Sequence, residues 1–303
     1  MKGKTAAPDP FPFRNSRIIR SPTGSWKVPL LIIGIDIGST TTKAVSLENG
    51  RVVKKIKTKA QDAVTSATGA LGKMTIENGI KMSEIKRIMI TGAGATGIDG
   101  ELFGISTEKV NEINAIGAGG MFLSGRDNIV IANIGTGTAI IEAQKDKIIH
   151  LGGSGVGGGT ILGLAKKLLS LTDFADIMEL AGSGSIDTVD LLLEDIMAAD
   201  ISFLNKKSTA SNFGKMLDTA RNEDIAFGII NMVYQVIGMI SVFAARSRNI
   251  GRVIVTGSGS YNPLGKKVLA EITRMHAVAF EYPEDAEYTT AVGAGLCGIK
   301  GEM

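Results

Sequence analysis

Apolar residues alternate with small and polar ones in two similar stretches of the chain, and both stretches have the pattern of a β-hairpin. Ile33–Lys43 reads Ile-Gly-Ile-Asp-Ile-Gly-Ser-Thr-Thr-Thr-Lys, and a returning strand, Lys43–Leu47, follows it. Asn128–Glu142 repeats the plan with a buried strand, a Gly/Thr turn and a second strand. The repetition indicates an internal duplication.

The elements after the first hairpin complete one domain. Arg51–Thr58 has the pattern of a third strand, Gln61–Gly79 has apolar residues at helical spacing, and Ile85–Thr91 is an apolar run of strand length that leads into the glycine loop 92–97. This β-β-β-α-β order is the one that an RNase H-like domain requires, with the crossover helix packed on the sheet. We therefore predict an α/β protein with two RNase H-like domains, residues 29–125 and 126–303, and a cleft between them.

The second half repeats the strands and adds helices. Val253–Ser260 is a strand that closes in a Gly/Ser loop. Ile161–Leu171 is expected to be amphipathic, whereas Ile225–Ala245 is apolar almost all round and is expected to lie in the core and at a homodimer interface. The small residues of Glu287–Ile299 suit a helix that packs closely and crosses back to the first domain at a hinge.

Composition narrows the class of protein. The chain has 303 residues, which is enough for two cores, and a net charge of +3, which suggests neither nucleic acid nor an anionic membrane surface as partner. The single cysteine, Cys297, excludes a disulfide framework and is expected to serve packing. We expect no transmembrane segment, because the best candidate, Leu30–Ile37, is too short and carries Asp36. A cytoplasmic protein is the resulting expectation.

Residues 1–28 differ from the rest. They hold four of the seven prolines and the only tryptophan, Trp26, and six basic residues stand there against one acidic residue. We predict a poorly ordered extension in which Trp26 packs near the first strand, with a partner-binding arm as the alternative.

The turn of the first hairpin has the chemistry of a phosphate site. Gly38 allows backbone amides to approach an anion, the hydroxyls that follow it add donors, and Asp36 can hold Mg²⁺ directly or through water. A tight turn with solvated threonines is the alternative. The repeated hairpin and the third turn at Val253–Ser260 favour the phosphate interpretation, since this order resembles the actin, hexokinase and heat-shock chaperone superfamily of ATP-binding proteins.

A third glycine-rich segment precedes a helix. Residues 150–160 contain six glycines and lead into Ile161–Leu171. Because helix N-termini bind anions through free amides and the helix dipole, we assign this turn to the nucleotide phosphates, with a flexible hinge as the alternative. Phe174 offers an apolar surface to an adenine ring, although core packing explains it equally well.

Glu112 is the candidate catalytic base. A glutamate near a helix N-terminus is usually a solvated first-turn residue favoured by the dipole. The second hairpin, however, offers Asn133 where many sugar kinases of the superfamily carry an aspartate, so a base for a substrate hydroxyl must come from elsewhere. Glu112 is the carboxylate best placed for that role.

Three segments together carry a closer resemblance. Ala-Asn-Ile-Gly-Thr-Gly-Thr (132–138), the glycine-rich run 152–164 and Thr-Ala-Ser-Asn-Phe-Gly (209–214) resemble the type II, eukaryotic-like pantothenate kinases in their short bacterial form. The resemblance implies Mg²⁺ and ATP as cofactors, Glu112 as the base, and pantothenate as the small-molecule acceptor in the first step of coenzyme A biosynthesis. The implied ATP contacts are Asp36, Ile37, Gly38, Ser39, Thr40, Thr41, Thr42, Lys43, Gly135, Thr136, Gly137, Thr138, Gly158, Gly159, Thr160, Ile161, Leu162, Phe174, Gly257 and Ser258. On the acceptor side it implies Glu112 and the positions of Ala139, His150, Gly152 and Gly153.

The chain departs from the family at two of these acceptor positions. The family usually has a serine where Ala139 stands and an arginine where His150 stands, and both help to hold pantothenate. A hydroxyl donor and a permanent cation are thus replaced by a methyl group and an imidazole that is mostly neutral at pH 7. A kinase that acts on another small alcohol therefore remains an alternative.

Two further alternatives share the fold. The activators of 2-hydroxyacyl-CoA dehydratases have almost the same first hairpin, but they bind an iron–sulfur cluster through cysteines, for which Cys297 alone is too little. A non-catalytic sensor or repressor is the other, but residues 1–28 are too short and too rich in proline for a helix-turn-helix.

Overall fold

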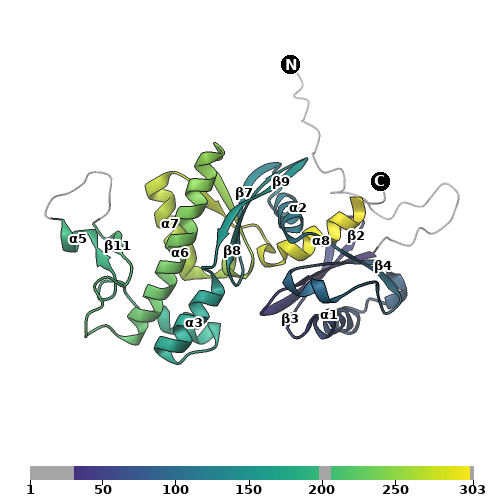
Figure 1. The fold of residues 1–303 in the computed structure, drawn as a ribbon, viewed down its shortest axis with the longest axis horizontal. Coiled ribbons are helices and arrows are strands. Elements are labelled where there is room, and N and C mark those ends of the chain that lie inside the picture. Colours follow the sequence, from purple (N-terminus) through teal and green to yellow (C-terminus); the bar gives the residue numbers. More distant parts are fainter. Residues whose placement is uncertain (1–30, 198–205, 301–303) are drawn as a thin grey trace, which may run out of the picture. The chain divides into compact units, whose positions relative to one another are not determined.

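The computed structural model describes residues 31–197 and 206–300, except for the side chain of Lys300. The extension predicted at residues 1–28 lies outside these ranges. The described chain forms two compact units: unit 1 runs up to Val110 and resumes at Ala294, and unit 2 is Asn111–Gly293. Each unit is built on one larger β-sheet (Figure 1).

Unit 1 contains a sheet with the strand order β3-β2-β1-β4-β6-β5. Its elements are β1 (Leu31–Ile37), β2 (Thr41–Glu48), β3 (Arg51–Lys59), α1 (Ala63–Asn78), η1 (Met82–Glu84), β4 (Ile85–Thr91), η2 (Ala93–Gly97), β5 (Glu101–Leu102) and β6 (Ile105–Lys109), together with the end of α8 (Thr289–Lys300). The strands predicted at 33–47, 51–58 and 85–91 are confirmed, whereas β5 and β6 have no counterpart in the prediction.

Alternation along β1 divides its side chains between the two faces of the sheet. Ile33, Ile35 and Ile37 are buried in the core that α1 covers. Asp36 faces the other side, where the end of α8 packs so closely that a Cβ on Gly295 would lie 2.2 Å from Leu47 Cδ1. The pattern of the hairpin thus buries its isoleucines and leaves the carboxylate on the opposite face.

The predicted helix over 61–79 is confirmed, and its ends follow from local chemistry. The Asp62 side chain accepts a hydrogen bond from the Thr65 amide at 3.0 Å, which caps the N-terminus of α1. Gly79, at φ 68°, ends the helix in the left-handed region that glycine tolerates best.

Unit 2 is built on a sheet with the strand order β13-β12-β7-β8-β9. Its elements are α2 (Glu112–Ser124), β7 (Asn128–Ile134), β8 (Thr138–Gln144), β9 (Lys147–Ser154), α3 (Gly158–Leu169), α4 (Phe174–Ala181), β10 (Leu191–Leu192), α5 (Leu193–Ile196), β11 (Thr209–Ser211), α6 (Asn222–Ser247), β12 (Arg252–Thr256), η3 (Ser258–Tyr261), α7 (Pro263–His276), β13 (Ala279–Glu281) and η4 (Ala286–Tyr288), with the start of α8. Helices α3, α4, α6 and α7 share one core with the sheet, and α2 packs on its other face. Figure 1 shows α6 and α7 side by side.

The two sheets have the same topology, which agrees with the predicted duplication. In unit 1, β3 pairs antiparallel with β2, β2 antiparallel with β1, β1 parallel with β4, and β4 parallel with β6. In unit 2, β9, β8, β7, β12 and β13 pair in the same order with the same directions. The RNase H-like plan therefore occurs twice.

Helix α6 corrects one expectation and agrees with another. It is long and apolar enough to span a membrane by length and composition, so the prediction that no segment reaches that length was wrong. Its most apolar 18-residue window is 61% buried inside the protein. Ile229, Val233 and Ile237 belong to the core of unit 2, as expected for the helix predicted at 225–245.

Helix α2 packs with unit 2, whereas the sequence placed it at the end of the first domain. Ile116 is buried against β7, β8 and β12, because the apolar side of α2 covers that face of the sheet. The start of α8 lies against α2 through glycines: a Cβ on Gly293 would lie 1.7 Å from the carbonyl oxygen of Ala115. The compact units therefore divide at 110/111 and within α8 at 293/294.

Candidate active site

The first hairpin places Asp36 at the carboxyl end of β1. Asp36 is half-buried and lies in register with Lys43 on β2 and Thr91 on β4. Side chains in register on neighbouring strands point to the same face, so these three lie side by side. Lys43 is only 7% exposed. The structure thus assembles a carboxylate, an ammonium group and a hydroxyl at one edge of the sheet.

The turn of this hairpin is tight and open to solvent. The Gly38 amide donates to the Thr41 carbonyl at 3.2 Å, and a Cβ on Gly38 would lie 2.9 Å from that oxygen, so only glycine fits without movement. Ser39 and Thr40 are exposed at its tip. Thr42, by contrast, is fully buried on the α1 face of the sheet.

The backbone beyond β4 lies against the end of β1. Gly92 has φ 90°, and a Cβ there would lie 2.7 Å from Asp36 Oδ1 and 2.6 Å from the Ile37 carbonyl oxygen. A side chain at position 92 would therefore displace the carboxylate.

The surroundings of Asp36 fit a magnesium ion that is held mainly by water and phosphate. Mg²⁺ usually takes one or two carboxylates from the protein and keeps several waters. Among the described residues, no three His, Cys, Asp or Glu side chains gather into a metal site. The Thr91 hydroxyl beside Asp36 is buried and has no hydrogen-bond partner in the described part of the chain, so a hydrogen-bond donor is available on the strand next to the carboxylate.

The second hairpin repeats this geometry without the charge. Asn133 stands at the position of Asp36 and lies in register with Ala139 and Thr256. Thr256 Oγ1 donates to Asn133 Oδ1 at 2.9 Å. Gly257, with φ 78°, repeats Gly92, since a Cβ there would lie 2.4 Å from the Ile134 carbonyl oxygen.

The glycine-rich segment has a structural role that the sequence did not indicate. The amides of Gly158 and Gly159 donate to the carbonyl oxygens of Gly135 and Thr136, both at 2.9 Å, and the amides of Thr160 and Ile161 donate to Gly157. The premise of free helix-terminal amides was therefore wrong for these four groups. A Cβ on Gly157 would lie 2.6 Å from the Thr136 carbonyl oxygen, so the glycines let α3 begin directly on the hairpin.

Two structural boundaries differ from the predicted ones in this segment. Helix α3 begins at Gly158 rather than Ile161, with Leu162 in its first turns. Strand β9 continues through His150, Gly152 and Gly153 to Ser154, so half of the predicted turn belongs to the sheet.

The remaining predicted nucleotide contacts lie elsewhere in unit 2. Phe174 is the first residue of α4 and packs partly against the core, which agrees with the packing interpretation. Gly257 is buried at the end of β12, and Ser258 is exposed at the start of η3.

Glu112 is the first residue of α2. Asn111 caps α2 because its side chain accepts a hydrogen bond from the Asn114 amide at 3.2 Å. The preceding strand, β6, ends at Lys109. Glu112 is exposed, but the surrounding protein partly desolvates its carboxylate, and this raises the pKa of Glu112. A raised pKa makes a carboxylate a stronger base.

The predicted acceptor residues lie on the face of the sheet that α2 covers. Ala139 is half-buried against the α2 core, and it pairs with Gly153 across β8 and β9. His150 pairs with Ile141 of that core and is exposed. Glu112, Ala139 and His150 thus belong to one helix and one sheet face of unit 2.

Sequence reasoning missed two features. The strand ends read Thr-Gly-Ala-Gly at 91–94 and Thr-Gly-Ser-Gly at 256–259, and this repeat could have identified Thr91 and Thr256. The other is Asp190, which is fully buried and accepts hydrogen bonds from Thr209 Oγ1 at 3.0 Å, the Phe213 amide at 2.9 Å and Asn231 Nδ2 at 2.8 Å. Asp190 therefore fixes the Thr-Ala-Ser-Asn-Phe-Gly segment, and no local pattern in the sequence pointed to it.

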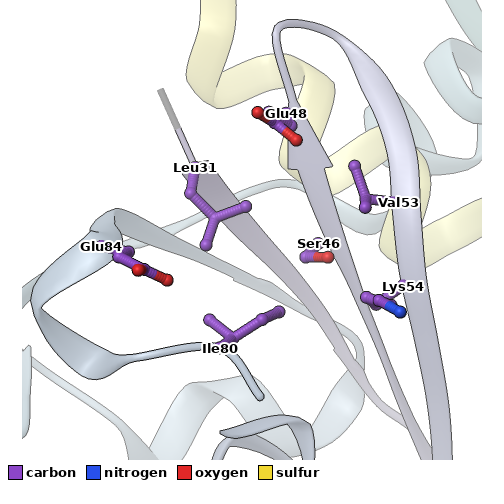
Figure 2. A pocket seen from close by; sticks show the side chains of 7 residues that line it. All are labelled: Leu31, Ser46, Glu48, Val53, Lys54, Ile80 and Glu84. Carbon is purple, nitrogen blue, oxygen red and sulfur yellow. The ribbon is translucent and has the colours of Figure 1, made fainter. Parts of the chain in front are cut away.

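A cavity of about 260 Å³ in unit 1 lies away from these residues (Figure 2). It is lined by Leu31, Ser46, Glu48, Val53, Lys54, Ile80 and Glu84. Leu31 and Glu48 pair at the end of β1 and β2 that is remote from the hairpin turn, so the cavity does not include Asp36.

Known proteins show where this arrangement belongs. The type II pantothenate kinase of Bacillus cereus strain AH820 is 31% identical over 277 residues, which cover 87% of this chain and 96% of the relative. The chain belongs to the type II pantothenate kinase family. A second family member, from Staphylococcus haemolyticus strain JCSC1435, is 29% identical and covers 86% of the chain and 98% of its own length. The family model described as Fumble matches residues 127–264.

Solved structures agree with the fold predicted for a type II pantothenate kinase. The activator of 2-hydroxyisocaproyl-CoA dehydratase from Clostridium difficile, with bound ADPNP, has a TM-score of 0.65 at 18% identity and covers 90% of this chain and 95% of that one. A ROK family glucokinase from Streptomyces griseus, with glucose and AMPPNP, has a TM-score of 0.57 at 17% identity, with coverage of 88% and 98%. At these identities the likeness concerns the fold, and the predicted fold class is confirmed.

Proposed function

We propose that the protein is an ATP-dependent kinase that phosphorylates the primary hydroxyl of pantothenate, the first step of coenzyme A biosynthesis. The observation that carries this proposal is the similarity to type II pantothenate kinases, which extends over 87% of the chain at 31% identity. ATP as phosphoryl donor is supported by the ATP analogues named with two proteins of the same fold. We further propose cytoplasmic location and a homodimer.

Asp36 is the residue to which we assign the metal. When bound with the nucleotide, Mg²⁺ would neutralise charge on the phosphoryl group in transfer. The half-buried carboxylate of Asp36 would hold the hydrated ion, and Lys43 beside it would add a fixed positive charge. The turn residues Gly38 to Thr41 offer amides and hydroxyls to the phosphates.

The second hairpin and α3 carry further proposed nucleotide contacts. Because the amides of Gly158 and Gly159 are occupied by the hairpin carbonyls, α3 would act by fixing the shape of the 135–137 turn. The proposed contacts at Gly135 to Thr138, Gly158 to Leu162, Phe174, Gly257 and Ser258 follow the family pattern.

Glu112 is the proposed general base. Its position at the first turn of α2 lies on the side of unit 2 where Ala139 and His150 line the sheet. A carboxylate with a raised pKa is better matched to removing a proton from an alcohol than an ordinary glutamate. Glu112 would take the hydroxyl proton as the oxygen attacks the terminal phosphorus of ATP, and ADP would leave.

An activator-type ATPase is the second candidate, because an activator of this fold has a TM-score of 0.65 to the chain. Such an activity needs several cysteine ligands for an iron–sulfur cluster, whereas the sequence contains one cysteine, half-buried in α8. Anaerobically purified protein without visible absorbance from a cluster would exclude this candidate.

The test of the proposal is ADP release with a panel of acceptors. Pantothenate is compared with uncharged primary alcohols of similar size, and the phosphorylated product is identified by mass spectrometry. We expect turnover with pantothenate and loss of turnover in Glu112→Gln. Turnover restricted to an uncharged alcohol would support the kinase assignment and overturn pantothenate as the acceptor. A protein that carries an iron–sulfur cluster and hydrolyses ATP without any acceptor would overturn the kinase assignment.

A further inference from the structure

The duplicated units differ at a buried hydroxyl on the strand beside the hairpin. They differ likewise within the hairpin, where the Thr42 hydroxyl has no hydrogen-bond partner in the described chain and its counterpart Thr138 donates to the Val156 carbonyl oxygen at 2.9 Å. In unit 2, Thr256 is fully buried, and its hydroxyl donates to Asn133 Oδ1 at 2.9 Å. In unit 1, Thr91 occupies the same place beside Asp36 and is 1% exposed. Its hydroxyl, however, has no hydrogen-bond partner among residues 31–197 and 206–300.

This difference needs a physical reason, because a buried hydroxyl without a partner destabilises a protein. A valine has the shape of threonine and no polar atom, so it would fill the same space without that penalty. Position 91 nevertheless carries the hydroxyl on the strand next to Asp36.

The Asp36 carboxylate lies next to the strand that carries this hydroxyl. Asp36 and Thr91 are in register on adjacent parallel strands, so their side chains share a face. Asp36 Oδ1 lies over Gly92, the residue that follows Thr91, at 2.7 Å from where a Cβ of Gly92 would be. The carboxylate and the Thr91 hydroxyl are therefore neighbours on one face of the sheet.

We propose that Thr91 is a positioning residue for the metal site: its hydroxyl donates to the Asp36 carboxylate when Mg²⁺ and nucleotide are bound, and thereby fixes the oxygen that faces the ion. The inference rests on the proposed function, since it concerns the same Asp36. Thr91 itself contacts neither ion nor nucleotide. The unit 2 pair of Thr256 and Asn133 shows the geometry that the unit 1 pair adopts on binding.

Thr91→Val and Thr256→Val are a matched pair that tests this proposal. Melting temperature is measured without ligand, and binding of the non-hydrolysable ATP analogue AMPPNP is measured by calorimetry over a series of Mg²⁺ concentrations. Thr91→Val should melt at the wild-type temperature or above, because no hydrogen bond is lost. Thr256→Val should melt lower, because Asn133 Oδ1 loses its donor.

In ligand binding the two variants should rank in the opposite order, with Thr91→Val the more impaired. A hydrogen bond to a charged group contributes enough that its loss raises the half-saturating Mg²⁺ concentration roughly tenfold in Thr91→Val. Thr256→Val should keep the wild-type Mg²⁺ dependence, and Thr91→Ser should restore it. In an Asp36→Asn background, Thr91→Val should have no further effect, since the carboxylate it positions is gone.

The outcomes separate this inference from the proposed function. If wild type binds AMPPNP and Thr91→Val shows an unchanged Mg²⁺ dependence, the positioning role is wrong and the kinase proposal stands. If Thr91→Val melts lower than wild type and binds normally, Thr91 serves only packing. If wild type binds no nucleotide at any Mg²⁺ concentration, both are overturned.

Discussion

Replacing Gly293 by alanine tests how α8 packs in unit 2. Helices α2 and α8 meet through two glycines, Gly119 and Gly293, with no side chain between the backbones. A Cβ on Gly293 would lie 1.7 Å from the Ala115 carbonyl oxygen, 2.6 Å from its carbonyl carbon and 2.8 Å from the Gly119 amide. All three atoms belong to backbone, so no flexible side chain can move aside.

The expected magnitude follows from two opposing effects. Alanine in a helix interior is favoured over glycine by about 1 kcal/mol. Overpacking a tight contact costs about 1 to 3 kcal/mol and occasionally more, and here an ordinary contact distance requires the two helices to separate. We expect Gly293→Ala to lower the free energy of unfolding by about 2 kcal/mol.

Gly163→Ala is the matched control. Gly163 lies on an exposed side of α3, and no atom lies within 4 Å of the position of its Cβ, so this variant should gain about 1 kcal/mol. The assay is urea unfolding followed by circular dichroism, with the slope m compared to check that the unfolding transition has not changed its character. If Gly293→Ala proved as stable as Gly163→Ala, the close approach of α2 and α8 would be refuted.

The proposed chemistry yields further predictions. Glu112→Gln should lower turnover by about a hundredfold or more, with AMPPNP affinity retained, and should remove the acid limb of the pH–rate profile, which in wild type lies above the pKa of an ordinary glutamate. Ala139→Ser combined with His150→Arg should lower the Michaelis constant for pantothenate, because it gives the acceptor site the hydroxyl and the permanent cation that the family usually has. An unchanged Michaelis constant would argue against positions 139 and 150 as part of the pantothenate site. Arg221 holds the pKa of Asp224 near 2, below its ordinary 3.8, so this ion pair stabilises the fold above pH 3.8 and its contribution is lost as the pH falls toward 2. Because the guanidinium is largely exposed, solvent screens the pair and its contribution is small, and acid titration of Asp224→Asn should lack it.

The sequence predicted those parts of the fold in which burial imposes a regular spacing of apolar residues. Strands β1, β4 and β7 are rich in buried isoleucine, and α1 has apolar residues at helical spacing between an Asp cap and a Gly cap, so all four were found with small boundary errors. Strand β6 reads Ile-Ser-Thr-Glu-Lys and is mostly exposed, so its alternation carried no information.

Glycine was the residue whose role sequence alone could not assign. The same composition serves a phosphate turn, a hinge or a close backbone contact, and residues 157–159 turn out to pack against the second hairpin. Their neighbours in space, Gly135 and Thr136, lie more than one element earlier in the chain. Asp190 shows the same limit, because its partner Asn231 is 41 residues away and only the fold brings them together.

The candidate site residues also differ in how far the sequence alone could predict them. Asp36 was predicted from local chemistry, as a carboxylate at the end of a buried strand, and Glu112 was predicted because the second hairpin carries Asn133 in place of an aspartate. Thr91 has no such local marker, because its meaning depends on a comparison with Thr256 in the other sheet. Only the comparison of the two duplicated units therefore draws attention to Thr91.

The divergence between the two halves also explains why we propose the metal at one hairpin and not at the other. With the same backbone, unit 1 presents Asp36 beside Lys43, whereas unit 2 presents Asn133 beside Ala139. The neutral amide already accepts the Thr256 hydroxyl, so its oxygen is engaged before any ligand arrives. A carboxylate has more acceptor sites than an amide oxygen and can face an ion while it accepts a hydrogen bond. On the proposed assignment, Asp36 would serve the metal, Asn133 has a structural role, and the base for the acceptor would come from Glu112 on α2.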